Sequence, residues 1–171
     1  TATPSAKPVT AVPSSRPSIT GLVATVSAST STTGALDSED VANYEQNVAE
    51  YYGVDVDAVT TEVVYSASGS LTVSVPEDVS EEELVQSVTE TIADSLGVHP
   101  QNVEVEVDLE TGEVSFTVVS NDFDVIQQAQ FNLQNEGVQG DIISSIVEDI
   151  PSAVVENLVV AEETTATIEF T

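Results

Sequence analysis

A stretch of alternating residues limits how this chain folds more than any other part of it. Residues 103–108 read Val-Glu-Val-Glu-Val-Asp, and residues 114–118 read Val-Ser-Phe-Thr-Val. Such alternation is typical of a strand with one apolar face and one solvent-facing face. Gly112 lies between the two runs and suits a tight turn. The sequence therefore predicts an antiparallel hairpin over residues 103–118.

Weaker copies of this hairpin lie on either side of it. One copy has strands at 59–63 and 71–75, with Gly69 at its turn. The other has strands at 157–160 and 166–170. Each copy follows an amphipathic helix, so the repeated unit is a helix, a short link and a hairpin, with a period of roughly 44 residues.

The helical spacing of apolar residues completes the expected order of elements. It predicts helices over residues 38–53, 80–97, 123–137 and 141–150, and a first strand precedes them at 18–28. We expect an α+β fold with antiparallel sheets, built from ferredoxin-like βαββαβ split units. Residues 18–110 form one such unit. Residues 111–171 form a second, incomplete βαββ unit that leaves a sheet edge uncovered.

The N-terminal residues 1–17 differ in kind from the rest and form an extended arm. The arm contains both basic residues of the chain, Lys7 and Arg16, whereas all thirty acidic residues lie from Asp37 onward. Its Ser, Thr and Pro content favours polyproline-like conformations and is typical of O-glycosylated stalks. The candidate sites of O-linked sugars or proline hydroxylation are Thr1, Thr3, Pro4, Ser5, Pro8, Thr10, Pro13, Ser14, Ser15 and Pro17.

The composition excludes several classes of function. A net charge of −28 disfavours binding to nucleic acid and to anionic membrane surfaces. Without cysteine there is neither a disulfide framework nor a thiolate metal site. No apolar run is long enough to span a membrane. The chain starts at Thr1 without methionine, which favours a processed, secreted and extracellular protein.

Candidate chemical sites are few. His99 is the only imidazole, and we expect it on the surface without a catalytic partner. The carboxylates on residues 104–108, with the Asp-X-Asp pairs at 55–57 and 122–124, form a solvated acidic face. They lack the twelve-residue loop of a specific calcium site, so only weak, diffuse calcium binding is the alternative. We therefore expect no enzyme activity and no cofactor.

The helices that end in Gly-Val, followed by alternating strands, carry a family resemblance. The segments YYGVDVDAVTTEVV and SLGVHPQNVEVEV are similar to SEA-like repeats of extracellular proteins from algae and other protists. They also resemble protomers of glycosylated extracellular fibrils found in environmental water samples. The resemblance covers residues 37–171 and implies a structural role. Self-cleaving SEA domains have a Gly-Ser motif in a hairpin, but the residues after Gly69-Ser70 depart from it, and we expect no cleavage.

These observations predict a structural subunit of a secreted, O-glycosylated filament that polymerises head to tail. The arm of one subunit adds as a strand to the acidic body of the next, so the partners are copies of the chain and O-linked glycans. The alternative is an acidic extracellular module that binds cations or mineral, and a carbohydrate-active enzyme comes third. The residues expected to join subunits are Lys7, Val9, Ala11, Val12 and Arg16.

Overall fold

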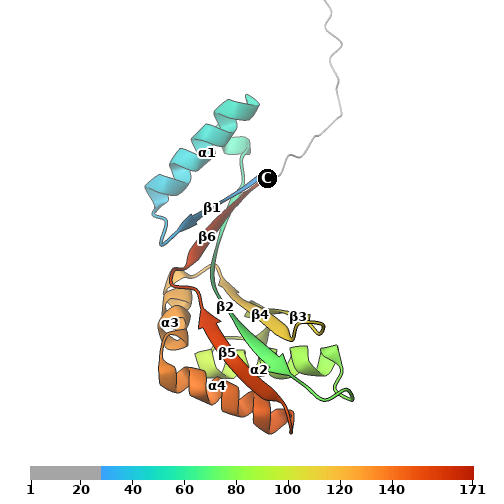
Figure 1. Cartoon of the computed structure of the whole chain (residues 1–171). Helices are drawn as coiled ribbons and strands as arrows, with labels where there is room; N and C mark the ends of the chain where they lie inside the picture. Colours follow the sequence, from blue (N-terminus) through green and yellow to red (C-terminus); the bar gives the residue numbers. More distant parts are fainter. Residues whose placement is uncertain (1–27) are drawn as a thin grey trace, which may run out of the picture.

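The structure, a computed structural model, describes residues 28–171 of the chain. One six-stranded sheet, four α-helices and two short 3₁₀ helices make up this part (Figure 1). The expected α+β class with antiparallel strands is confirmed. The elements are β1 (Ala28–Thr33), α1 (Ser38–Tyr52), η1 (Val56–Ala58), β2 (Thr61–Ser74), α2 (Glu81–Leu96), η2 (Pro100–Asn102), β3 (Val103–Asp108), β4 (Glu113–Ser120), α3 (Phe123–Leu133), α4 (Glu136–Asp149), β5 (Val154–Val160) and β6 (Thr165–Phe170).

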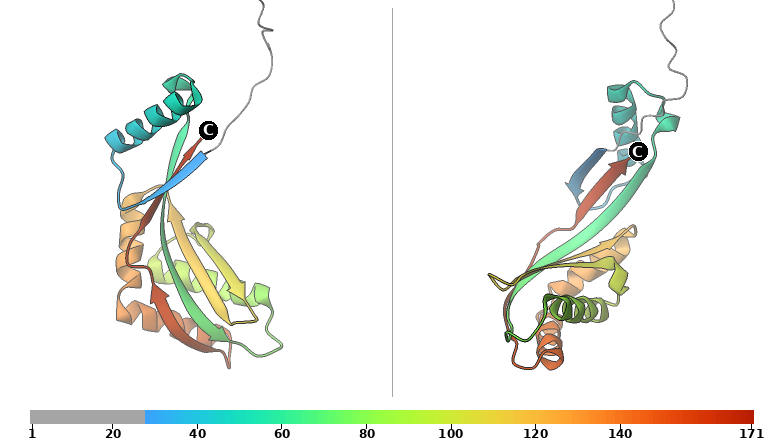
Figure 2. Two further views of the ribbon diagram at one scale, coloured as in Figure 1. Left: turned by 45° about the horizontal axis from the view of Figure 1, so that its top comes forward. Right: turned by 90° about the vertical axis from the view of Figure 1, so that its right-hand side faces the viewer.

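The long strand β2 organises the sheet. On one side it pairs with β4, which in turn pairs with β3. On its other side β6 pairs with residues 61–66 and β5 with residues 69–74, so β5 and β6 lie end to end along the same strand. Strand β1 lies outside β6. The views in Figure 2 show β2 extending through the length of the molecule.

Two of the three expected hairpins are wrong. The hairpin of β3 and β4 is confirmed, with Val103 opposite Val118 and Val107 opposite Val114. The copy with its turn at Gly69 is instead the continuous strand β2, because the alternation of buried residues runs through Gly69 without a change of phase. The C-terminal copy is not a hairpin either, since β5 and β6 each pair with β2.

A single split unit lies between Thr61 and Val160. Its element order, β2-α2-β3-β4-α3-α4-β5, is that of a ferredoxin-like βαββαβ unit whose second helix is divided in two. The expected units at 18–110 and 111–171 do not occur as separate sheets, because β4, β5 and β6 all pair with β2. Of the strand expected at 18–28, only its last residue lies within the described part, where β1 begins.

Capping residues account for the helix boundaries. Ser80 accepts a hydrogen bond from the Glu83 N–H at the start of α2, and Gly97 ends that helix with a φ of 70°. Helix α1 begins at Ser38, as expected, and its N-cap is Asp37. Asn135 caps α4, so this helix begins at Glu136, three residues after α3 ends at Leu133 and well before the expected position 141.

The main core lies between three helices, α2, α3 and α4, and the lower part of the sheet, which comprises β3, β4, β5 and residues 67–74 of β2. Phe116 from β4, Ile92 from α2 and Ile126 from α3 are fully buried there. The upper part, which comprises β1, α1, β6 and residues 61–66 of β2, has much less core. Helix α1 contributes one buried residue, Ala49. Within residues 28–171, no helix is long and apolar enough to cross a membrane.

Candidate assembly surfaces

The arm residues expected to join subunits lie outside the described residues 28–171, as do all the candidate glycosylation sites. The structure describes residues 28–171, which we call the body. Four features of this body are relevant: the acidic residues, the sheet edges, an exposed tyrosine patch and a groove beside α3.

The acidic residues do not converge on a metal site. Glu104, Glu106 and Asp108 are exposed on β3, as the alternation predicts. Asp55 and Asp122 cap η1 and α3, so the two Asp-X-Asp pairs serve local structure. In the part of the chain that the structure describes, no three His, Cys, Asp or Glu side chains are grouped so that they could hold an ion.

Asp108 has a specific structural role at the β3–β4 turn. Its carboxylate accepts hydrogen bonds from the backbone N–H of Glu110, at 2.9 Å, and of Thr111, at 3.3 Å. These bonds, that from Glu110 first, hold the pKa of Asp108 below its ordinary value of 3.8. The charge of this residue therefore stabilises a turn.

His99 and Gly69 are both structural. His99 caps η2, where its Nδ1 accepts a hydrogen bond of 3.2 Å from the Gln101 N–H. Gly69 faces the ring of Phe116 in the middle of β2. The Gly69-Ser70 pair is thus in a continuous strand and not at a hairpin turn.

The outer edges of the sheet differ in how they are protected. The edge of β3 presents exposed acids, and charge on an edge discourages pairing with another strand. Strand β5 contains a bulge, where its register with β2 shifts between Ser70 and Thr72 and Asn157 has a φ of 53°. Strand β1 pairs through all six residues with β6 and has neither charge nor proline. Among the described edges, that of β1 is the least protected.

The upper half of β2 has a second open edge. Its residues 61–64 pair with β6 on one side, while β4 pairs with β2 only from Tyr65 onward. No described strand lies beside residues 61–64 on that second side. The Thr61 hydroxyl is buried and has no hydrogen-bond partner within residues 28–171. Within residues 28–171, one side of this part of the sheet thus lacks a strand.

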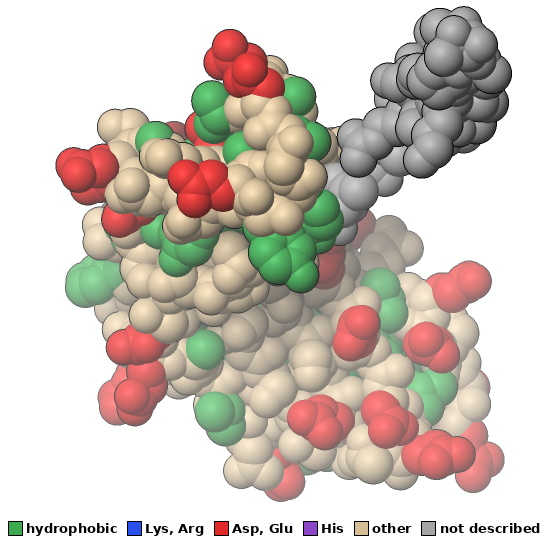
Figure 3. Space-filling model, turned by 90° about the horizontal axis from the view of Figure 1, so that it is seen from above, with side chains coloured by type: hydrophobic (Ala, Val, Ile, Leu, Met, Phe, Trp, Pro, Cys, Tyr) green, Lys and Arg blue, Asp and Glu red, His purple; other side chains and the backbone are tan. Residues whose placement is uncertain are grey.

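Exposed apolar side chains gather at the C-terminal end of α1 and in η1. Tyr51 is 83% exposed, and Tyr52, Val54 and Val56 are all exposed by more than two fifths. The two tyrosine rings contact each other edge to face, with centroids 5.0 Å apart. We call these four residues the tyrosine patch. Figure 3, which views the molecule from above, shows apolar and acidic side chains interspersed on the upper surface.

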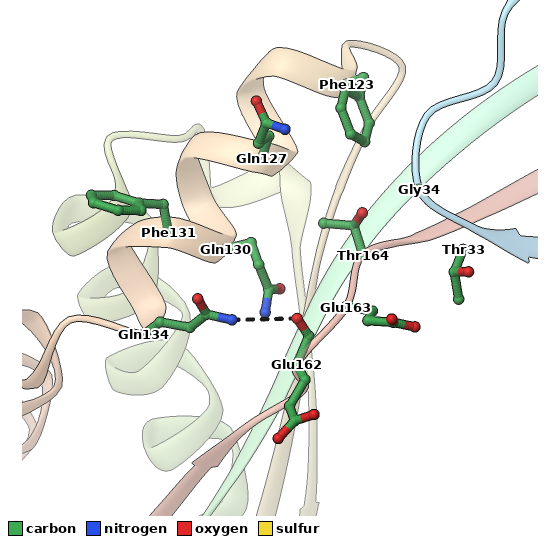
Figure 4. Close-up of a pocket in the computed structure, with 10 residues that line it drawn as sticks. All are labelled: Thr33, Gly34, Phe123, Gln127, Gln130, Phe131, Gln134, Glu162, Glu163 and Thr164. Carbon is green, nitrogen blue, oxygen red and sulfur yellow. Dashed lines mark hydrogen bonds between the residues drawn. The ribbon is translucent and has the colours of Figure 1, made fainter.

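A groove of about 550 Å³ lies where the upper and lower parts meet (Figure 4). One wall is α3, and the other is formed by the turn at 33–34 and the link at 162–164. Two aromatic rings belong to the α3 wall. The ring of Phe123 contacts that of Tyr65 edge to face, with the two centroids 5.1 Å apart. Phe131 is 67% exposed. We call this feature the α3 groove.

Three glutamines give the α3 groove its polar character. Gln130 and Gln134 extend from successive turns of α3 toward the link at 162–164, and Gln127 lies on the turn before them (Figure 4). The Gln134 amide donates to the Glu162 carbonyl oxygen at 3.3 Å. Gln130 is only 7% exposed; its Nε2 donates to the carbonyl oxygen of Ala161, and its Oε1 is buried without a partner in the described chain.

The sequence prediction included Gln127 and Gln130 only as helix positions. Their spacing of three and then four residues, completed by Gln134, is a detectable signal for an amide row on one helix face. The opposite wall could not be inferred in the same way, because it depends on β5 and β6 lying end to end along β2.

No protein-family model matches this chain, and neither the curated proteins nor the solved structures contain a match to it.

Proposed function

We propose that the protein is the structural subunit of a secreted, O-glycosylated extracellular filament, which grows head to tail when the arm of one subunit binds the body of the next. The observation that carries this proposal concerns the edges of the upper sheet. Among residues 28–171, the edges of β1 and of residues 61–64 in β2 have no paired strand, so their backbone N–H and C=O groups can pair with an added strand. The apolar arm residues Val9, Ala11 and Val12 suit such a strand.

The distribution of charge favours this arrangement. Residues 28–171 contain no Lys or Arg, and the only two such residues of the chain are in the arm. Two bodies therefore repel each other, whereas an arm attracts a body. An exposed ion pair contributes only about 0–1 kcal/mol, so backbone pairing and apolar burial supply most of the binding free energy.

The contact has different donor and acceptor surfaces. Such a heterologous contact repeats without closing and yields a helical filament rather than a dimer. The tyrosine patch, at the same upper part as the open edges, supplies apolar area for the interface.

Deletion of residues 1–17 tests the proposal. The truncated chain is expected to stay monomeric in size-exclusion chromatography and to form no filaments in electron microscopy, with an unchanged far-UV circular dichroism spectrum per residue. A matched control replaces Lys7 and Arg16 by Ala in the full chain, which retains backbone pairing and is expected to weaken assembly without abolishing it. Filaments of the truncated chain would overturn the proposal.

Glycosylation is tested separately by intact mass spectrometry of the native protein. The Ser, Thr and Pro content of the arm leads us to expect a mass above 17.9 kDa by whole hexose or pentose increments that map to residues 1–33. A native mass equal to that of the bare chain would remove the glycan from the proposed function.

A further inference from the structure

The α3 groove has the chemistry of a site for an extended peptide. Its three glutamine amides offer both N–H donors and C=O acceptors along about 10 Å of helix, at a rise of about 1.5 Å per residue. The hydroxyls of Thr33 and Thr164 line the opposite wall. Phe123 and Phe131 add flat apolar surfaces. Amides that alternate with aromatic rings suit a ligand whose backbone is free and whose side chains are compact and apolar.

Within residues 28–171, the side-chain amide of Gln130 in the groove is incompletely hydrogen-bonded. A buried polar atom without a hydrogen bond is unfavourable, and native proteins rarely contain one. Among residues 28–171, Gln130 Oε1 is such an atom, although its neighbour Nε2 donates to the carbonyl oxygen of Ala161. An incoming N–H or O–H group would satisfy it once the Gln130 side chain turns toward the groove.

The Ser/Thr/Pro-rich arm of this chain has matching properties. A polyproline II helix has no internal hydrogen bonds, so its backbone groups stay free for side-chain partners. Proline-rich segments in this conformation bind grooves lined by aromatic side chains. The helix has three residues per turn, which places every third residue on one face. In that register the arm would present on a single face Pro4, Lys7, Thr10, Pro13 and Arg16.

The charge of the α3 groove and its position beside β1 indicate which residues of the arm would bind there. Glu162 and Glu163 are exposed where they line the groove, and Arg16 lies one polyproline turn after Pro13. The groove also continues the least protected sheet edge, because Thr33 both ends β1 and lines the groove. Residues Val9–Val12 along that edge would lead directly to Pro13 at the groove.

We infer that the α3 groove is the acceptor site for residues 13–16 of the arm from another copy of this chain. Pro13 contacts the ring of Phe123, backbone groups at Ser14 and Ser15 bond the glutamine amides, and the long side chain of Arg16 reaches the carboxylates of Glu162 and Glu163. This inference rests on the proposed function and names the acceptor surface of the same assembly.

Cysteine pairing tests the inference directly, because the natural chain has no cysteine. One full-length variant carries Pro13→Cys, and a second carries Gln127→Cys on the exposed rim of the groove. The two are mixed under mild oxidation, and disulfide-linked heterodimers are measured on non-reducing gels. Leu109→Cys is the matched control, since Leu109 is 49% exposed at the β3–β4 turn, away from the groove.

The expected result is at least tenfold more heterodimer with Gln127→Cys than with Leu109→Cys. Adding Gln130→Leu to the Gln127→Cys partner is expected to reduce that yield several-fold while circular dichroism shows the same fold. Equal yields with both partners, or no heterodimer with either, would overturn the inference. A chain with both Pro13→Cys and Gln127→Cys that forms only an internal disulfide would also overturn it, because the arm would then bind its own body.

Electron microscopy of the same samples separates this inference from the proposed function. If filaments form but Pro13→Cys shows no preference for Gln127→Cys in disulfide formation, the proposed function is retained and the arm binds a surface other than the α3 groove. Selective pairing in samples that contain only closed oligomers would support the groove and count against the filament.

Discussion

Gly69 occupies a position in β2 where no side chain fits. A Cβ at this residue would lie 2.5 Å from Phe116 Cζ and 2.8 Å from the Val159 carbonyl oxygen. The second contact is with backbone, which cannot rotate away. Gly69→Ala is therefore expected to lower the free energy of unfolding by about 1–3 kcal/mol, the range for overpacked cores. Urea denaturation followed by circular dichroism measures this change.

Gly140 supplies the matched control for that substitution. A Cβ built at this position in α4 meets nothing within 4 Å. Alanine is favoured over glycine in a helix, so Gly140→Ala is expected to raise the free energy of unfolding by about 0.5–1 kcal/mol. If both variants behaved alike, the close packing of Gly69 against Phe116 would be contradicted.

Asp108 makes the stability of the β3–β4 turn depend on pH. Its pKa in the folded protein is lower than the ordinary value of 3.8, so its contribution is present in full above that value. This contribution to the free energy of unfolding is lost as the pH falls from 3.8 through the lower pKa that Asp108 has in the folded protein. Asp108→Asn is thus expected to destabilise the protein at neutral pH, and the difference from wild type shrinks at lower pH. Urea midpoints at about pH 7 and about pH 2.5 measure the effect.

Glu106→Gln is the control for Asp108→Asn. Glu106 lies on the same strand and accepts no hydrogen bond from any described residue, so its substitution removes a negative charge without removing a turn contact. Because the chain has a net charge of −28, we expect this variant not to destabilise the protein at neutral pH. Equal losses in both variants would indicate that charge alone, and not the turn, explains Asp108.

Among the elements, α1 has the least support from packing. It buries one residue, Ala49, whereas α2 buries seven. Helical stability in proteins comes mostly from a packed apolar face, and weakly packed segments open locally at low free-energy cost. The amides of α1 are therefore expected to exchange hydrogen at least tenfold faster than those of α2 in the unassembled chain.

Hydrogen exchange with mass spectrometry measures this difference peptide by peptide. The same experiment on assembled material gives a second comparison, since burial of the tyrosine patch would protect α1. Exchange of α1 that is as slow as that of α2 in the monomer would contradict the expected order.

Local patterns predicted the elements better than they predicted the connections. The alternation at 103–118 and the helical spacing at 80–97 gave correct elements, because each depends on neighbours in sequence. The turn expected at Gly69 is wrong, because the glycine at this position leaves room for the ring of Phe116, which is 47 residues away in the chain. The α3 groove was missed for the same reason: its two walls meet only when β5 and β6 share β2 as partner.

For the molecule as a whole, repulsion between bodies opposes assembly. The Debye length is about 8 Å at physiological ionic strength, so charges on adjoining subunits interact unless salt screens them or a cation bridges them. We expect assembly to strengthen with added salt and with millimolar calcium. Light scattering against ionic strength measures the effect, and sodium chloride at matched ionic strength separates screening from bridging.

A steady loss of scattering as salt rises would contradict this expectation. It would show that attraction between the two cations of the arm and the acidic body outweighs repulsion between bodies.

The absence of Lys and Arg from residues 28–171 also affects how trypsin can cleave the protein. An aspartate in the specificity pocket of trypsin selects a basic residue before the cleaved bond, and residues 28–171 offer none. The two basic residues of the arm are each followed by proline, Pro8 after Lys7 and Pro17 after Arg16. The proline ring removes the N–H and restricts the residue before it, which makes both bonds poor substrates. The polypeptide thus withstands trypsin by composition, even when unfolded, whereas proteases that cleave after glutamate find sites throughout the body.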